Sequence, residues 1–367
     1  MDRVTQLTRS PVGVSSSFAP PPSSSCITIP VWSLYLDPPG DNNEFITSIS
    51  SCLLAASGHG FLLLDAHKSR DKVDGSSLEA VYQRFERRVC NPVTGELFRL
   101  PDFPGSAKTS TDGMGLLTYQ ADGADGPPNR YAAAQLTEAA GGRRFMLRRF
   151  SSETGDWSEL VLPSPLPPGR RMHMNHRHEV LDFGGRLWWV DVAWGAVCVD
   201  PFSDRPELRA VELPAGSMRP GGQDEADMRQ LVKSRRMGVS AGRLRYVEID
   251  SVHIRSFTLD DESGSWTLEH QVPFADLWPN VPMPPSIASI DPLNTDVLHV
   301  KKLYFNVSVD MCQNRVIESC QSTLLSKYLP CVLPSFLGSS PIPGKNNVEE
   351  NKTLADVLVR SDSHPKT

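Results

Sequence analysis

The chain has 367 residues, a formal net charge of −6, and 39% hydrophobic and 22% charged residues. This composition is ordinary for a globular protein, so a chain that is disordered throughout is excluded. The mild acidity also argues against a nucleic-acid-binding protein, which would carry a strongly basic surface. The 31 prolines and 26 glycines favour many short strands joined by turns over long helices.

The first 26 residues are rich in serine and proline, and we expect them to form a disordered leader. They lack the long apolar run of a signal peptide, although Arg3 and Arg9 leave an organelle transit peptide as an alternative. The most apolar stretch, Leu187–Val199, is too short to span a bilayer and contains Asp191. The seven cysteines include no CxxC pair, which is typical of reduced thiols in a cytoplasmic or nuclear protein.

From about residue 45, a unit of roughly 50 to 60 residues returns along the chain. Its first part is a strand led by a glycine, at Gly60, Gly115, Gly185 and Gly242. Its second part is a strand that runs into a polar turn, as in Cys90-Asn91-Pro92-Val93-Thr94-Gly95, where an asparagine cap precedes a proline and a glycine. Its last part is a strand that ends on proline, at Pro101, Pro163, Pro214 and Pro273.

A repeat of this length fits a four-stranded blade of a β-propeller, because one small sheet must stack on its neighbours to bury both of its faces. We therefore predict an all-β, propeller-like array of about five four-stranded blades with few short helices. The fifth blade has the weakest pattern, at 296–320, and a strand near residue 30 could complete it to close the ring. This propeller-like domain would span residues 27–334, and residues 335–367 would form a partly disordered tail.

Three segments have helical or ambiguous patterns. Ser76–Arg87 could form a short helix, and Asp224–Ser234 consists of good helix formers with Asp224 as a cap. Thr353–Val359 fits either a helical turn or a strand.

Candidate site residues are few, because no catalytic motif is present: there is no GxSxG, P-loop, strand-borne GxGxxG or HExxH. His173, His176 and His178 are candidate metal ligands, with structural or surface histidines as the alternative. Trp188, Trp189 and Trp194 could form a surface for stacking a peptide or sugar, although packing between blades also explains these indoles. We predict no catalytic and no cofactor-binding residues.

Several segments carry a resemblance to a known family. The run His178–Asp191, followed by Gly195 and Val199-Asp200-Pro201-Phe202, resembles the core of the plant domain-of-unknown-function 1618 family, which is expanded in grasses. Cys90–Pro101 and Leu329–Gly338 are similar to the same family, so the resemblance covers about residues 28–340. The blades also resemble those of F-box-associated and kelch-type propellers. The resemblance implies a propeller fold and a plant origin, and it supplies no active-site residues.

Taken together, these patterns favour a protein that is not an enzyme and binds no cofactor. We expect a non-catalytic interaction scaffold that binds an unknown protein partner through loops on one face of the ring. We expect no nucleic-acid partner, no membrane and a monomer. Two alternatives stay open: a small-molecule or glycan-binding protein that uses the propeller channel, and a substrate-recognition adaptor related to F-box-associated proteins.

Overall fold

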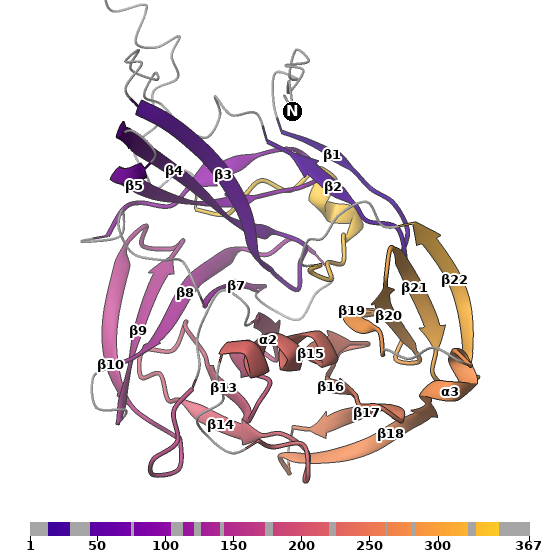
Figure 1. Ribbon diagram of the computed structural model, residues 1–367. Helices are drawn as coiled ribbons and strands as arrows, with labels where there is room; N and C mark the ends of the chain where they lie inside the picture. The colour runs from indigo at the N-terminus through magenta and orange to yellow at the C-terminus, as the bar shows by residue number, and fades with distance from the viewer. Residues whose placement is uncertain are drawn as a thin grey trace, which may run out of the picture.

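The protein folds into five four-stranded antiparallel sheets arranged as the blades of a β-propeller (Figure 1). The computed structural model describes residues 14–29, 45–74, 77–103, 113–120, 126–139, 143–172, 179–219, 225–261, 263–279, 284–321 and 328–344. Each blade is built from four strands that are consecutive in the sequence. The predicted fold class and number of blades are therefore confirmed.

The strands follow one another blade by blade. Blade 1 contains β3 (Phe45–Ala56), β4 (Leu62–Asp74), β5 (Ser77–Cys90) and β6 (Leu97–Arg99). Blade 2 contains β7 (Met114–Tyr119), β8 (Arg130–Glu138), β9 (Arg144–Ser151) and β10 (Trp157–Pro163). Blade 3 contains β11 (Val180–Phe183), β12 (Arg186–Asp191), β13 (Gly195–Val199) and β14 (Arg209–Glu212). Blade 4 contains β15 (Arg235–Ser240), β16 (Arg243–Ile249), β17 (His253–Asp260) and β18 (Ser265–Pro273). Blade 5 contains β19 (Ser286–Ile290), β20 (Val297–Lys302), β21 (Phe305–Asp310) and β22 (Arg315–Gln321).

The propeller has two distinct ends. The first strand of each blade lies nearest the centre and the fourth lies at the rim (Figure 1). Because neighbouring strands run in opposite directions, the turns that leave the first and third strands of every blade gather at one end, here called the turn end. The connections between blades, and the turns between second and third strands, gather at the other end, here called the crossover end.

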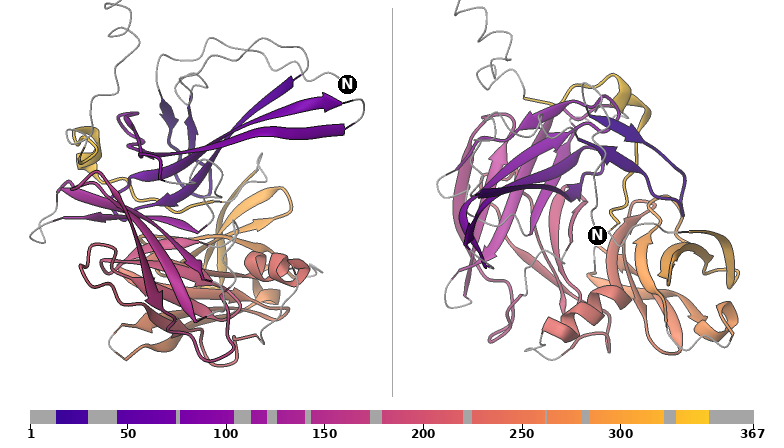
Figure 2. Two further views of the ribbon diagram at one scale, coloured as in Figure 1. Left: turned by 90° about the vertical axis from the view of Figure 1, so that its left-hand side faces the viewer. Right: turned by 45° about the horizontal axis from the view of Figure 1, so that its top comes forward.

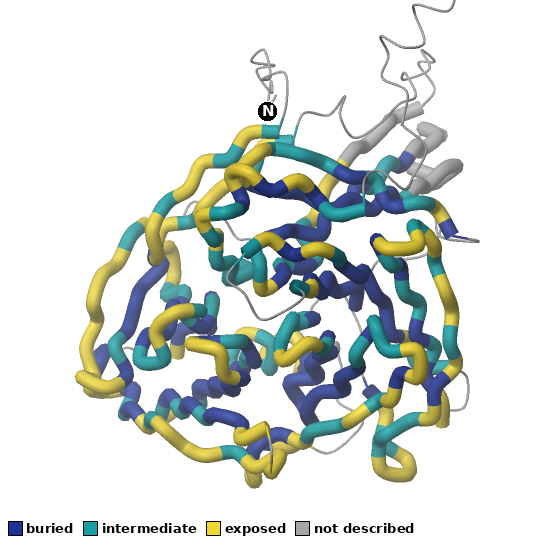
Figure 3. Tube along the Cα trace, turned by 180° about the vertical axis from the view of Figure 1, so that it is seen from behind, coloured by how far each residue is buried: buried dark blue, intermediate teal, exposed yellow. Residues whose placement is uncertain are grey.

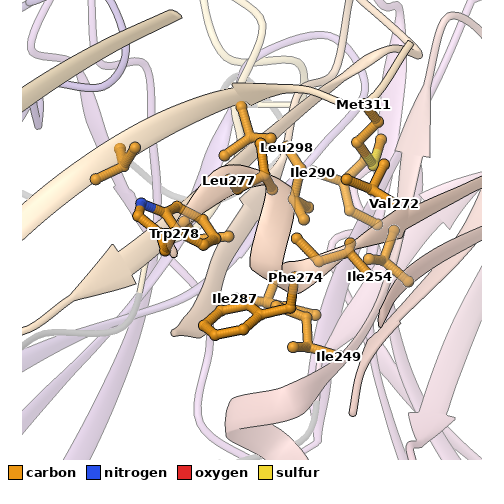
Figure 4. Close-up of a cluster of buried hydrophobic side chains, with 14 residues drawn as sticks. Ile249, Ile254, Val272, Phe274, Leu277, Trp278, Ile287, Ile290, Leu298 and Met311 are labelled. Atoms are coloured by element: carbon orange, nitrogen blue, oxygen red, sulfur yellow. The ribbon is translucent and has the colours of Figure 1, made fainter. Parts of the chain in front are cut away.

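The core consists of apolar layers between neighbouring blades. Between blades 4 and 5, Ile249 and Ile254 meet Ile290 and Leu298, and Phe274 of the short helix α3 (Phe274–Leu277) joins the same cluster (Figure 4). A similar cluster lies between blades 2 and 3. Its buried side chains include Leu117, Phe145, Leu147, Leu187, Trp189 and Val197. Viewed from behind, the buried residues follow the inner strands, whereas exposed residues follow the rim and the turns (Figure 3). Burial between blades is therefore the main force that holds the ring together.

The ring closes between blades 5 and 1 through the two terminal segments. A two-stranded hairpin, β1 (Ser15–Ser17) and β2 (Cys26–Thr28), runs along the rim from blade 1 toward blade 5 (Figure 1). A C-terminal segment, residues 328–344, passes from blade 5 to blade 1 and includes the 3₁₀ turn η3 (Ser335–Gly338). Asn306 of β21 connects the two, since its Nδ2 donates to Pro22 O (3.2 Å) and its Oδ1 accepts from the Tyr328 hydroxyl (3.3 Å).

This closure differs from the sequence prediction in the role of the N-terminal strand. The strand near residue 30 pairs with β1 and does not complete the fifth blade, which has four strands of its own. The predicted domain boundaries, 27 and 334, stay a prediction. On the C-terminal side, Leu337 and Ile342 are buried in the apolar cluster between blades 1 and 2.

The helical predictions have mixed outcomes. Helix α2 (Glu225–Ser234) confirms the segment predicted from 224, whereas its proposed cap, Asp224, lies outside the described residues. The helix predicted at 76–87 is wrong, because residues 77–87 belong to the long strand β5, which pairs with β4 along its length. Thr353–Val359 lies outside the described residues.

Figure 2 shows that β3, β4 and β5 extend beyond the body of the propeller. Within the described part of the chain, no helix is both long and apolar enough to cross a bilayer.

Candidate functional site

The predicted metal ligands His173, His176 and His178 lie outside the described residues, so the metal site stays a prediction. Elsewhere, in the parts of the chain that the structure describes, no three histidine, cysteine, aspartate or glutamate side chains gather closely enough to hold a metal ion.

The three tryptophans lie in the core. Trp188 and Trp189 alternate on β12, so one packs toward blade 4 and the other toward blade 2. The Trp189 indole Nε1 donates to Gly113 O (2.6 Å), and the Trp188 Nε1 donates to Phe183 O (3.0 Å). Trp194 is only 4% exposed. The structure thus places Trp188, Trp189 and Trp194 in packing between blades and leaves no open indole face for a stacking surface.

A polar cluster lies where the innermost strands of blades 1, 2 and 3 reach the turn end. The Asp182 carboxylate of β11 accepts hydrogen bonds from Gly58 N (2.9 Å) and from both the backbone N and the hydroxyl of Thr118 (3.4 Å each). His59 Nδ1 lies 2.8 Å from the same Thr118 hydroxyl. One carboxylate therefore joins three blades at the centre of the ring.

The electrostatics of this cluster follow from its burial. Loss of solvation raises the pKa of Asp182 to about 6, and the hydrogen bonds from Gly58 and Thr118 oppose that rise. Burial also lowers the pKa of His59, which favours a neutral imidazole near pH 7. Asp182 accepts from Thr118 and not from His59, so the arrangement lacks the histidine–carboxylate contact that orients the base in a catalytic triad. The cluster is best described as a joint between blades.

A charged contact crosses the centre nearer the crossover end. The Arg236 guanidinium of β15 forms an ion pair with Glu179, just before β11. It also donates to the carbonyl oxygens of Ala288 on β19 and Tyr328 in the C-terminal segment. Arg236 thereby ties blades 3, 4 and 5 to the C-terminal segment. Polar interactions therefore connect neighbouring blades at the centre of the ring, both at the turn end and nearer the crossover end.

Among the apolar side chains of the described residues, the two with the highest exposed fractions form a turn at the crossover end of blade 5. Leu303 and Tyr304 connect β20 to β21 and are 80% and 72% exposed, and the adjoining Phe305 is 48% exposed. Leu303 adopts a positive φ of 55° at the first of the two turn positions. That conformation favours glycine and is strained for a leucine. We call Leu303–Phe305 the apolar turn.

Sequence reasoning missed the apolar turn. Leu303–Asp310 has the pattern of one continuous strand, and an apolar residue in a buried strand looks the same in sequence as one at an exposed turn. The absence of glycine or asparagine before Phe305 hid the reversal of the chain. Lys301 and Lys302, which precede the turn, were the available signal that this segment reaches the surface.

Comparison with known proteins finds one family model that matches part of the chain, and several solved structures. No curated protein matches the sequence. The solved structures that match include AztD from Citrobacter koseri (TM-score 0.33, 9% identity, 74% of this chain and 72% of that chain). They also include the β-propeller domain of Cps50 (Swd1) from Myceliophteria thermophila (TM-score 0.35, 11% identity, 77% and 90%) and a protein from Lactobacillus plantarum (TM-score 0.32, 13% identity, 76% and 84%). Residues 189–304, from β12 to the apolar turn, match the model of the family described as "Protein of unknown function (DUF1618)".

Proposed function

We propose that this protein is a non-catalytic scaffold that binds a protein partner through the apolar turn of blade 5. The observation that carries the proposal is the exposure of Leu303 and Tyr304 at the tip of a hairpin. Single exposed apolar residues are common on protein surfaces, but three in succession at a protruding turn form a contiguous contact. Tyrosine is also enriched among the residues that contribute most to binding at protein interfaces.

The stability of the hairpin does not explain why Leu303 and Tyr304 occupy the turn. A two-residue hairpin turn is most stable with glycine or asparagine where φ is positive, and leucine there costs about 1 kcal/mol or more. Two other non-glycine residues adopt a positive φ, Ala241 and Asn314, and Leu303 is the largest and most apolar side chain of the three. The apolar turn is therefore unfavourable both for solvation and for backbone conformation, which supports a role in contacting another molecule.

The charge around the turn indicates the chemistry of the partner. Lys301 and Lys302 lie directly before Leu303, and the Lys302 ammonium stacks over the Trp278 ring at 4.9 Å. A complementary partner would present an apolar pocket with an acidic rim, because such a rim pairs with the two lysines as the pocket receives Leu303 and Tyr304. The adaptor alternative is a special case of such a scaffold and is covered by the same experiment.

The test compares partners captured by three forms of the full chain from an extract of its source organism. The double variant Leu303→Ser, Tyr304→Ser removes the apolar turn, and Leu293→Ser is the matched control, since Leu293 is 71% exposed at the opposite end of blade 5. We expect at least one protein to be retained by the native chain and the control, and to be retained at least tenfold less by the double variant. Equal capture by all three forms would contradict the proposal.

The free energy of unfolding of a glycine variant tests whether Leu303 destabilises the turn. We expect Leu303→Gly to raise the free energy of unfolding by roughly 0.5–1 kcal/mol, because relief of the strained φ outweighs the added freedom of the unfolded chain. Urea unfolding of the purified variant measures this change. A loss of stability would show that Leu303 has a structural role.

The glycan or small-molecule alternative is favoured by a different observation, the polar cluster of His59, Thr118 and Asp182 at the centre of the turn end. Its groups match the hydrogen-bonding needs of a sugar, although each is already engaged between blades. Binding of the native chain to a glycan array, lost in Asp182→Asn, would support this alternative.

A further inference from the structure

The C-terminal segment docks on blade 1 through a small number of specific contacts. The Asn91 Nδ2 group donates to two of its carbonyl oxygens, Leu337 O and Ser340 O, at 2.9 Å each. The backbone N of Ile342 donates to a Glu96 carboxylate oxygen at 2.9 Å. Asn91 is fully buried with the segment in place, so its amide donor depends on these carbonyl oxygens for its hydrogen bonds.

Apolar anchors and a close backbone approach complete the contact. Leu337 and Ile342, at most 1% exposed, enter the cluster that contains Phe61 and Leu63 of blade 1. At Gly60, which has a φ of +84°, an added Cβ would lie 2.6 Å from Leu337 Cδ1, so only glycine leaves room for the anchor. Asn91, Glu96, Gly60 and the cluster beside them are here called the socket.

The segment is bound through side-chain hydrogen bonds and apolar anchors, as a peptide ligand is, and not through strand pairing. Within the described residues, the segment pairs with no strand of the propeller. Its secondary structure is the 3₁₀ turn η3. Its carbonyl groups are bonded by the Asn91 side chain, whose Oδ1 at the same time caps the β5–β6 turn through Val93 N and Thr94 N. Two apolar anchors five residues apart, with side-chain hydrogen bonds between them, form a sequence-specific recognition pattern.

We propose that the socket is a peptide-binding site, and that its occupant, residues 328–344 of the same chain, is exchangeable for the identical segment of a second copy. The docked segment closes the ring of its own chain when bound in cis. When bound in trans it joins two copies by exchange of an identical element, a known route to dimers. The tether makes the cis form dominant, because it gives the segment a high effective concentration at the socket.

The test uses the full chain with a site-specific protease sequence inserted between Gln321 and Tyr328, cut after folding. The probe is a labelled synthetic peptide of residues 328–344, and its binding is followed by fluorescence anisotropy. We expect saturable binding to the cut protein that is at least tenfold tighter than binding to the uncut protein. The cut removes the tether, so its own segment no longer competes at high effective concentration.

Two variants test the specificity of the site. Asn91→Asp keeps the oxygen that caps the β5–β6 turn but removes the amide donor, and we expect it to weaken peptide binding at least tenfold. Asn129→Asp is the matched control with the same charge change, at an exposed position in the β7–β8 connection at the turn end, and should leave binding unchanged. The labelled peptide with Leu337→Asp leaves the protein intact and should also bind at least tenfold more weakly.

Three results would overturn the proposal. They are equal peptide binding by cut and uncut protein, binding that is insensitive to Leu337→Asp in the peptide, and unfolding of the cut protein that excess peptide does not prevent. Because the apolar turn lies at the crossover end of blade 5, none of these results bears on the proposed scaffold function.

Discussion

At the scale of single residues, Asp182 connects ionisation to the cohesion of the ring. Its carboxylate accepts from blades 1 and 2 while it stands on blade 3. Burial raises the pKa of Asp182 to about 6, so the folded protein holds this proton more tightly than the unfolded chain does. The contribution of Asp182 to stability is thus fully present below about pH 4 and is lost as the pH rises through 6.

Replacement of Asp182 by asparagine should remove this pH dependence. The asparagine side chain stays neutral and retains an oxygen for the Gly58 N–H, so we expect the stability of Asp182→Asn relative to the native chain to rise by roughly 1–2 kcal/mol between pH 4 and 7. Urea unfolding of both proteins across this range measures the difference. Both contain His59, so its titration largely cancels in the comparison. A difference that does not change with pH would show that Asp182 keeps an ordinary pKa in the folded state.

At the scale of strands, two of the three sequence ladders follow the blades closely. The polar turns after Cys90, Ser151, Val199 and Asp260 all leave third strands. The closing prolines all stand at the last residue of a fourth strand or two residues beyond it. The glycine ladder mixes two positions, since Gly60, Gly185 and Gly242 precede second strands whereas Gly115 lies within the first strand of blade 2. Turn chemistry is local and therefore readable from sequence, but a glycine required by packing looks the same as a glycine required by a turn.

The glycines of the innermost strands give a matched pair for testing how tightly blades approach. An added Cβ at Gly115 would lie 2.4 Å from Val180 Cγ1 of blade 3, whereas at Gly238 it would lie 3.3 Å from the flexible end of Ile290. We expect Gly115→Ala to lower the free energy of unfolding by about 2 kcal/mol and Gly238→Ala by less than about 1 kcal/mol. Thermal or urea unfolding measures both. Equal effects would mean that blades 2 and 3 can separate without penalty.

The misread strand β5 shows the other limit of local reasoning. Ser77–Cys90 contains strong helix formers such as glutamate, alanine and arginine, yet it pairs with β4 over its whole length. Helix propensity is a preference of less than about 1 kcal/mol per residue, and a long antiparallel ladder overrides it. Likewise, the socket brings Asn91 to Leu337, 246 residues apart, and no sequence period could have predicted that contact.

At the scale of the whole molecule, the seam between blades 5 and 1 differs from the other blade junctions. Three junctions, from blade 2 to blade 5, are apolar layers formed by the blades themselves. The layer between blades 1 and 2 also takes in Leu337 and Ile342, and the seam depends on both terminal segments. Val14 and Ile27 from one segment and Cys331 from the other pack together against Leu62 and Leu64 of blade 1. Asn306 then joins both segments to blade 5.

If Asn306 is the shared joint, its loss should loosen both segments together. We expect Asn306→Ala to speed amide hydrogen exchange at least tenfold in residues 15–28 and 328–342, without faster exchange in the buried strands β12 and β13. Asn294→Ala, in the β19–β20 connection of the same blade, is the control. Exchange measured by mass spectrometry would contradict this prediction if only one of the two segments responded.

The closing role of residues 328–344 has a consequence for how the protein is made. Synthesis proceeds from the N-terminus, so every strand of the five blades leaves the ribosome before the segment that completes the seam. Until then, the apolar surface of blades 1 and 2 that later holds Leu337 and Ile342 is open to other nascent chains. A premature stop codon shortly after Gln321 would therefore yield all five blades with an unsealed ring, and we expect the harm to arise from aggregation during translation more than from lost blade structure.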